Sequence, residues 1–123
     1  MTIAELFAKV DRLHPNQYGT EDKTRWLNEI EGKVNDEIIN AAEGNDEEFV
    51  PYIYDQDQDR ELLAPDRFCA LYIYYIAAMC DHTDMEVEAY NNDAAMHQAA
   101  YDEFAAWYRR KNLPKTSRVI RGW

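Results

Sequence analysis

The stretch APDRFCALYIYYIAAMC, residues 64–80, contains a segment from Phe68 to Cys80 that is apolar on every side. As a helix, such a segment has to be surrounded by protein. After the polar break DHTD comes a run of residues spaced alternately three and four apart, namely Val87, Tyr90, Ala94, His97, Tyr101, Phe104 and Tyr108. This spacing places one stripe along one helix face, which suits packing against a neighbouring helix. Together the two segments predict a buried helix over 65–80 and a long helix over 85–111.

Two further helices are predicted before this pair. Thr2 and Glu5 have the spacing of a capping box at the start of a helix over 2–13, with a buried stripe of Ile3, Leu6, Phe7 and Val10. Pro15 disfavours helix at the residue before it and ends this segment. Thr20 is the expected N-cap of the next helix, and Gly44 and Asn45 are suitable C-cap residues. Its expected inner face holds Leu27, Ile30, Val34, Ile38 and Ala41 or Ala42, with Trp26 beside it.

The segment from about residue 45 to 64 breaks the helical pattern. Phe49 to Tyr54 suit a short extended piece, which Pro51 confines to an edge, and an acidic run follows. Unstructured connections of this length are often functional or mobile. We therefore predict an all-α fold: a compact bundle of four main helices with a long, partly extended loop (about 45–64) and a basic C-terminal tail. Residues 1–111 form the helical domain and 112–123 the basic arm.

The charge of the chain is unevenly distributed. The chain has 123 residues, enough for a single core. Residues 1–108 hold all 24 Asp and Glu against 7 Lys and Arg, a net charge of −17, whereas residues 109–123 hold 6 Lys and Arg and no acid. An acidic body repels nucleic acid and membrane surfaces. The basic end suits either of these, or the acidic body of a neighbouring copy.

The cysteines and the hydropathy indicate a soluble intracellular protein. Cys69 and Cys80 are eleven residues apart and, on one helix, would stand roughly 16 Å apart at about 1.5 Å per residue. A disulfide needs Cα atoms within about 7 Å, so we expect two reduced core thiols. No apolar run reaches the roughly 18 residues of a membrane span. The N-terminal segment MTIAELFAKVDR is amphipathic and acidic, unlike a signal peptide.

Three groups of polar residues invite a chemical interpretation. A calcium-loop pattern is partly matched, with aspartates at its positions 1, 3, 5 and 12, namely Asp55, Asp57, Asp59 and Asp66. The pattern requires glycine at its sixth position and glutamate at its twelfth, where this chain has Arg60 and Asp66. We therefore favour a solvated acidic loop over a metal site there, with Asp55, Asp57 and Asp59 as weak candidate ligands.

The other two groups centre on a thiol and on aromatic residues. Cys80, His82 and Asp84 crowd a helix end, but a zinc site needs about four ligands and a catalytic thiol needs a positioned base. His97 and the tyrosines Tyr72, Tyr74 and Tyr75 are expected to be core and interface residues. Nothing here predicts an enzyme, a metal centre or a cofactor.

The C-terminal tail is the one polar feature that we rank as functional. Two interpretations are open: a frayed terminus, or an arm laid on an adjacent subunit. In the second interpretation the interface residues are Arg109, Arg110, Lys111, Lys115, Arg118, Ile120, Arg121 and Trp123.

Three segments resemble a known family. PNQYGTEDKTRWLNEIEG (15–32), YIYYIAAMCD (72–81) and EAYNNDAAMHQAAYDEFAAWYRRKNLPK (88–115) are similar to the head–tail connector, or adaptor, proteins of long-tailed phages and of prophages of Firmicutes. The resemblance covers about residues 6–115, and its most specific parts are YNND at 90–93 and WYRR at 107–110. None of these motifs is catalytic. The chain departs from the pattern at His97, where an aromatic or aliphatic residue is expected.

The resemblance implies an all-helical subunit that assembles as a homo-oligomeric ring under the portal protein. Such a ring extends the DNA channel and docks the tail or the next adaptor, and DNA passes through without sequence-specific binding. The expected location is the head–tail junction of the virion, and the host cytoplasm during assembly, with no membrane contact. The loop at 45–63 is expected to face a neighbouring ring or the lumen, and the tail to engage a neighbouring subunit or the portal.

Two other classes of function stay open at this point. An acidic DNA-mimic protein, inhibiting a host nuclease or DNA-binding protein, suits the net charge of −11, although the basic tail argues against it. An enzyme that uses the Cys80–His82 neighbourhood is the other alternative.

Overall fold

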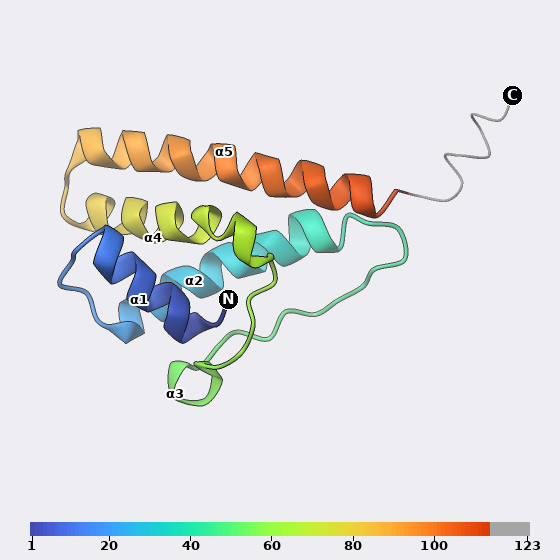
Figure 1. Cartoon of the computed structure of the whole chain (residues 1–123), viewed down its shortest axis with the longest axis horizontal. Helices are drawn as coiled ribbons and strands as arrows, with labels where there is room; N and C mark the ends of the chain where they lie inside the picture. The colour runs from blue at the N-terminus through green and yellow to red at the C-terminus, as the bar shows by residue number, and fades with distance from the viewer. Residues whose placement is uncertain (114–123) are drawn as a thin grey trace, which may run out of the picture.

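The helix α4 (Ala70–Thr83) is the centre of the molecule. The computed structural model describes residues 1–113. In it α4 lies between α5 (Val87–Lys111), which runs back along it, and the pair α1 (Ile3–Leu13) and α2 (Thr20–Val34) on its other side (Figure 1). The predicted all-α bundle of four main helices is confirmed. Among the described residues, no helix has the length and apolar character needed to cross a membrane.

The first helix follows its sequence prediction closely. The Thr2 hydroxyl accepts a hydrogen bond from the Glu5 amide at 3.2 Å, and the Glu5 carboxylate accepts one from the Thr2 amide at 2.9 Å, which completes the capping box. The predicted stripe is confirmed, since all four of its members are buried, namely Ile3, Leu6, Phe7 and Val10. The helix ends at Leu13, two residues before Pro15.

The second helix differs from the prediction at both ends. Its N-cap is Gly19 rather than Thr20, which lies in the first turn. At the other end, a wider π-helical turn, Asn35–Ile39, follows Val34 and closes with a bond from the Asn40 amide to the Asn35 carbonyl. The predicted inner face is confirmed for Leu27, Ile30, Val34 and Ile38. Because the helix ends before it reaches them, Ala41 is exposed and Ala42 only partly buried.

The central helix begins later and ends later than predicted. A 3-10 turn, Asp66–Phe68, precedes it, and α4 then continues through the polar residues to Thr83. The predicted break between the two helices is present but displaced: of DHTD only Asp84 lies in it, and the chain turns at residues 84–86, where Met85 has a positive φ of 60°. The segment that was predicted to be buried does form the core, with Leu71, Tyr72 and Ile76 completely enclosed.

The long helix α5 packs against two different partners. Its N-terminal half runs along α4, and its C-terminal half covers the π turn and the 3-10 turn. There the Tyr101 hydroxyl donates to Glu37 at 2.7 Å, and the Asn45 side chain donates to the Tyr108 hydroxyl at 3.0 Å. Because α5 is longer than α4, its C-terminal part extends beyond α4, and the contacts with the two short turns account for much of this extra length.

The predicted stripe on α5 is correct only in its central part. His97, Tyr101 and Phe104 are buried, whereas the side chain of Val87 is 69% exposed. Val87 lies in the first turn after the α4–α5 connection, where little of the bundle lies against the helix. Its prediction as a packing residue is therefore wrong.

The segment between α2 and α4 is held to the bundle by asparagine side chains. It contains a one-turn helix, α3 (Tyr54–Asp57), and in residues 1–113 the only β-type pairing is a bridge between Thr2 and Glu61. Asn28 both donates to the Tyr52 carbonyl and accepts from the Tyr52 amide, at 3.1 and 2.8 Å. The Asn40 side chain likewise donates to the Glu47 carbonyl and accepts from the Glu47 amide, with both hydrogen bonds at 2.8 Å. The long loop is therefore anchored at two points.

Candidate functional site

The basic end of α5 is accessible to a partner. Arg109, Arg110 and Lys111 form its last turn and are exposed. The other predicted interface residues, Lys115, Arg118, Ile120, Arg121 and Trp123, lie outside the described residues. Beside this end the Arg67 guanidinium lies 4.9 Å from the ring centre of Trp107, an arrangement typical of cation–π contacts. The surface around the tail attachment is therefore both basic and aromatic.

Eight large apolar side chains of residues 1–113 are exposed. Two pairs of them lie close together in the sequence, and the others are Leu13, Leu63, Met96 and Leu113. Met85 and Val87, at the α4–α5 turn, are 86% and 69% exposed. Val50 and Ile53, in the segment between α2 and α3, are 61% and 56% exposed. Figure 1 shows the α4–α5 turn at one end of the bundle and the segment after α2 looping out past the other end. A contiguous exposed apolar patch marks a surface that binds another protein, whereas single exposed apolar side chains are ordinary.

The weak calcium candidates are spread over the short helix α3 and the residues after it. Asp55 and Asp57 lie in α3, and Asp59 follows it. The Asp57 carboxylate accepts a hydrogen bond from the Ile53 amide at 2.7 Å and lies 3.6 Å from the Arg60 guanidinium. Asp66 contacts the Met1 amino group instead. These contacts give Asp57 and Asp66 structural roles.

The residues around Cys80 point in different directions. Cys80 is buried, and its burial raises the pKa of the thiol to about 11. The His82 ring packs on Tyr90 with ring centres 5.6 Å apart, while Asp84 accepts a hydrogen bond from the Tyr18 hydroxyl at 2.5 Å. A thiol that stays protonated is a poor nucleophile, so this neighbourhood lacks the features of a catalytic cysteine.

His97 occupies the core position that its sequence context predicts. Its ring is 8% exposed, and Nδ1 lies 2.7 Å from the Leu71 carbonyl oxygen, which only accepts, so Nδ1 carries the proton. Burial lowers the pKa of His97 and favours the neutral ring. The rings of Tyr75 and Tyr101 both pack against the His97 ring, with ring centres 5.1 and 5.9 Å away. The histidine is thus a hydrogen-bonded packing residue between α4 and α5.

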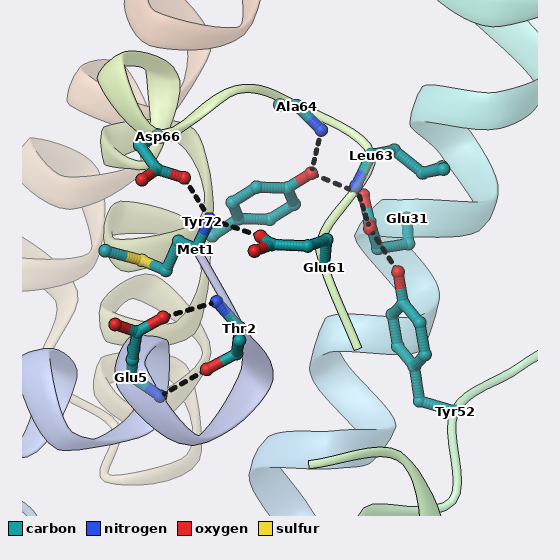
Figure 2. Close-up of polar contacts among 10 residues, drawn as sticks. All are labelled: Met1, Thr2, Glu5, Glu31, Tyr52, Glu61, Leu63, Ala64, Asp66 and Tyr72. Carbon is teal, nitrogen blue, oxygen red and sulfur yellow. Dashed lines mark hydrogen bonds and ion pairs between the residues drawn. The ribbon is translucent and has the colours of Figure 1, made fainter. Parts of the chain in front are cut away.

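A buried carboxylate joins four parts of the chain. Glu31 is completely buried, and it accepts hydrogen bonds from the hydroxyls of Tyr72 and Tyr52, at 2.6 and 2.7 Å, and from the Leu63 amide at 3.0 Å (Figure 2). The Tyr72 hydroxyl in turn accepts from the Ala64 amide at 2.9 Å. Burial raises the pKa of Glu31, although the three donors oppose that shift. The network fixes the end of the long loop against α2 and α4.

A second polar cluster lies where α1 ends. His14 follows α1, Asp81 lies in the last turn of α4 and Asp93 in the second turn of α5; one nitrogen or oxygen atom from each lies within 4.8 Å of the others. His14 Nε2 is 3.4 Å from Asp81 Oδ1. Burial, and after it the neighbouring Asp93 carboxylate, raise the pKa of Asp81 to about 6.

A buried lysine closes the same end of the molecule. The Lys23 side chain is 4% exposed, pairs with Asp11 at 2.8 Å and donates to the Tyr18 carbonyl at 2.5 Å. Tyr18 packs edge-on against Trp26, with ring centres 5.4 Å apart. These contacts hold the α1–α2 connection in place beside His14.

Glu31, Lys23 and Asp81 are buried, although their burial was not predicted from the sequence. A signal was present for the first two, because Lys23, Leu27, Glu31, Val34 and Ile38 follow one another at spacings of three and four. For Asp81 the signal was its position four residues after the buried Ala77. What no local pattern shows is that His14 and Asp93 come to lie beside it.

Comparison of the chain with protein-family models, with curated proteins and with solved structures found no match.

Proposed function

We propose that this chain is a head–tail connector subunit that assembles with copies of itself into a ring under a portal protein. The proposal rests on the resemblance carried by residues 15–32, 72–81 and 88–115, together with the positions of exposed apolar side chains. The observation that carries it is two pairs of exposed apolar side chains on separate segments: Met85 with Val87, and Val50 with Ile53.

A closed ring requires two different complementary surfaces on each subunit, because the contact between neighbours is head-to-tail. The two pairs of exposed apolar side chains lie on segments that are far apart in the fold (Figure 1). The segment with Val50 and Ile53 is held in one conformation by Asn28 and Asn40, so it presents a defined surface. In the proposed ring the α4–α5 turn of one subunit meets this segment of the next.

The charge distribution suits a channel wall and a docking arm. The body, residues 1–108, carries a net charge of −17 and the end of the chain +6. Phosphates are repelled by an acidic wall, so DNA would slide without being held. The basic arm would bind the acidic body of the adjacent subunit or the portal, beginning at Arg109, Arg110 and Lys111.

The test combines the purified chain with a portal protein from the same genome, and the mixture is imaged by negative stain. We expect portal particles to gain a ring of density at their tail-proximal face. A chain ending at Lys111 should stay folded, because α5 is intact, yet add no ring and leave heads without tails. If virions are still completed with the shortened chain, the arm does not have the proposed role of binding the adjacent subunit or the portal.

The DNA-mimic alternative predicts a different result in the same preparation. In that case the portal gains no density, and the chain instead binds a host nuclease or DNA-binding protein in competition with DNA. Such competition, together with an unchanged portal, would replace the connector proposal.

A further inference from the structure

Three side chains that commonly bind metals meet near the end of α1, although they lie far apart in the sequence. They come from three elements: His14 from the end of α1, Asp81 from α4 and Asp93 from α5. Within residues 1–113 this is the only group of three or more His, Cys, Asp or Glu side chains gathered so closely. Asp81 also lines a pocket of about 350 Å³ with Met85 and Val87, so the cluster adjoins the exposed apolar side chains of the α4–α5 turn. It shares no residue with the basic arm of the proposed connector.

The central member of the cluster is a buried carboxylate with an unpaired oxygen. The Asp81 side chain is 2% exposed, and among the described residues no donor reaches its Oδ2. Its Oδ1 is 3.4 Å from His14 Nε2, longer than an ordinary hydrogen bond of about 2.7–3.2 Å. The buried Lys23 does not compensate it, because its ammonium group pairs with Asp11. A buried charge without a partner is costly, so a cation at this point would stabilise the fold.

We propose that His14, Asp81 and Asp93 bind one divalent transition-metal ion of the zinc class. Imidazole nitrogen and carboxylate oxygen are ligands that Zn²⁺ accepts. Two atoms that each lie about 2.1 Å from a shared tetrahedral ion are roughly 3.4 Å apart, which matches the separation of His14 Nε2 and Asp81 Oδ1. Three protein ligands leave a fourth position for water.

The ion has a route to this position. His14 is 31% exposed, and His14 and Asp93 both line a groove of about 460 Å³ between α1, α4 and α5. Lys9 and Tyr74 lie farther along the same groove. Asp81 thus supplies the buried side of the site, and the other two ligands face the groove.

A bound ion would connect the end of α1 to both helices of the central pair. Because the unfolded chain does not hold these three residues together, binding would add directly to the stability of the fold. This consequence is independent of whether the chain forms a ring.

The experiment uses the full chain, treated with a chelator and titrated with ZnCl₂ by calorimetry, and with CoCl₂ by visible absorption. We expect one ion per chain and cobalt bands of a nitrogen–oxygen site. Asp81→Asn and His14→Gln should each weaken Zn²⁺ binding about tenfold or more, since even residues that only support metal ligands contribute that much. His82→Gln is the matched control: this histidine is exposed, adjacent to Asp81 and outside the cluster, and its loss should leave binding unchanged.

Thermal unfolding provides a second measurement that does not depend on the calorimetric signal. Zn²⁺ should raise the melting temperature of the wild-type chain and of the His82→Gln variant, but not that of Asp81→Asn, whose amide can bond to Asp93 and keep the fold. Absence of saturable binding at one ion per chain, or binding that survives Asp81→Asn and His14→Gln, would overturn the proposal. In that event the two carboxylates hold a proton between them instead of a metal.

Discussion

The Tyr72 hydroxyl donates a hydrogen bond to the Glu31 carboxylate at 2.6 Å, and both residues are completely buried. The contact joins α4 to α2 at the point where the long loop re-enters the bundle. The same carboxylate accepts bonds from Tyr52 and Leu63, which lie on either side of α3 (Figure 2). One acidic side chain in the core therefore organises a segment that has little regular structure of its own.

Replacement of Glu31 by alanine should destabilise the chain strongly. It leaves the hydroxyls of Tyr52 and Tyr72 and the amide of Leu63 without their acceptor in the interior, and each such group costs about 1–3 kcal/mol. Summed over the three groups, we expect a loss of roughly 3–5 kcal/mol in the free energy of unfolding, measured by urea denaturation. Glu29→Ala, two residues away on the exposed face, is the control and should change it by about 0.5 kcal/mol or less. Equal effects of the two changes would show that the network is not stabilising.

The stability that Glu31 contributes should depend on pH. Burial raises the pKa of Glu31 above its ordinary value of 4.5, so the folded chain keeps this proton to a higher pH than the unfolded chain does. Its contribution is fully present below pH 4.5 and is lost as the pH rises through the folded pKa. The free energy of unfolding of the wild type, relative to Glu31→Gln, should therefore fall as the pH rises from that value. Denaturation curves at several pH values test the sign, and a rising difference would contradict it.

Removal of the Asn28 side chain should release the long loop while leaving the bundle folded. Asn28→Ala deletes both hydrogen bonds to the Tyr52 backbone, at about 1 kcal/mol each. We expect faster amide hydrogen exchange at residues 46–53 and little change in α4 and α5. Arg25→Ala, on the exposed face of the same helix, serves as the control. Unchanged exchange in the loop would show that other contacts hold it.

The two cysteines should differ in reactivity. Cys80 is 1% exposed and its burial raises the pKa of the thiol to about 11, whereas Cys69 is partly exposed. Iodoacetamide at about pH 7.5 should label Cys69 in the folded chain and both residues in urea, because the thiolate is the reactive form. Peptide mass spectrometry identifies the labelled site. Rapid labelling of Cys80 in the folded chain would contradict this prediction and would support the alternative that the protein is an enzyme using this thiol.

The α4–α5 turn should matter for assembly and not for folding. Met85→Lys and Val87→Lys place charges on side chains that are already in solvent, so the free energy of unfolding should change by about 0.5 kcal/mol or less. In the proposed ring they should abolish the added density on portal particles. Met96→Lys, on the exposed side of α5, is the matched control. Rings that form normally with Met85→Lys would remove the turn from the proposed interface.

Most of the helices could be predicted because their signals are local. The capping box of Thr2 and Glu5, the stripe from Leu27 to Ile38 and the apolar run before Cys80 each describe a segment through its own residues. The errors occur where a neighbouring element changes the outcome. Val87 continues the stripe of α5 but is exposed, because α4 turns back before covering it.

The sequence established an all-α chain with an acidic body and a basic end, since periodicity and charge are properties of consecutive residues. The buried polar groups depended on tertiary structure. Glu31 is buried because Tyr52 and Tyr72 arrive from the loop and from α4 to bind it. In the same way Asp81 belongs to a cluster because folding brings His14 and Asp93 to it from distant parts of the chain. A charged residue can be buried only where such partners compensate it, and their arrival is decided by how the helices pack.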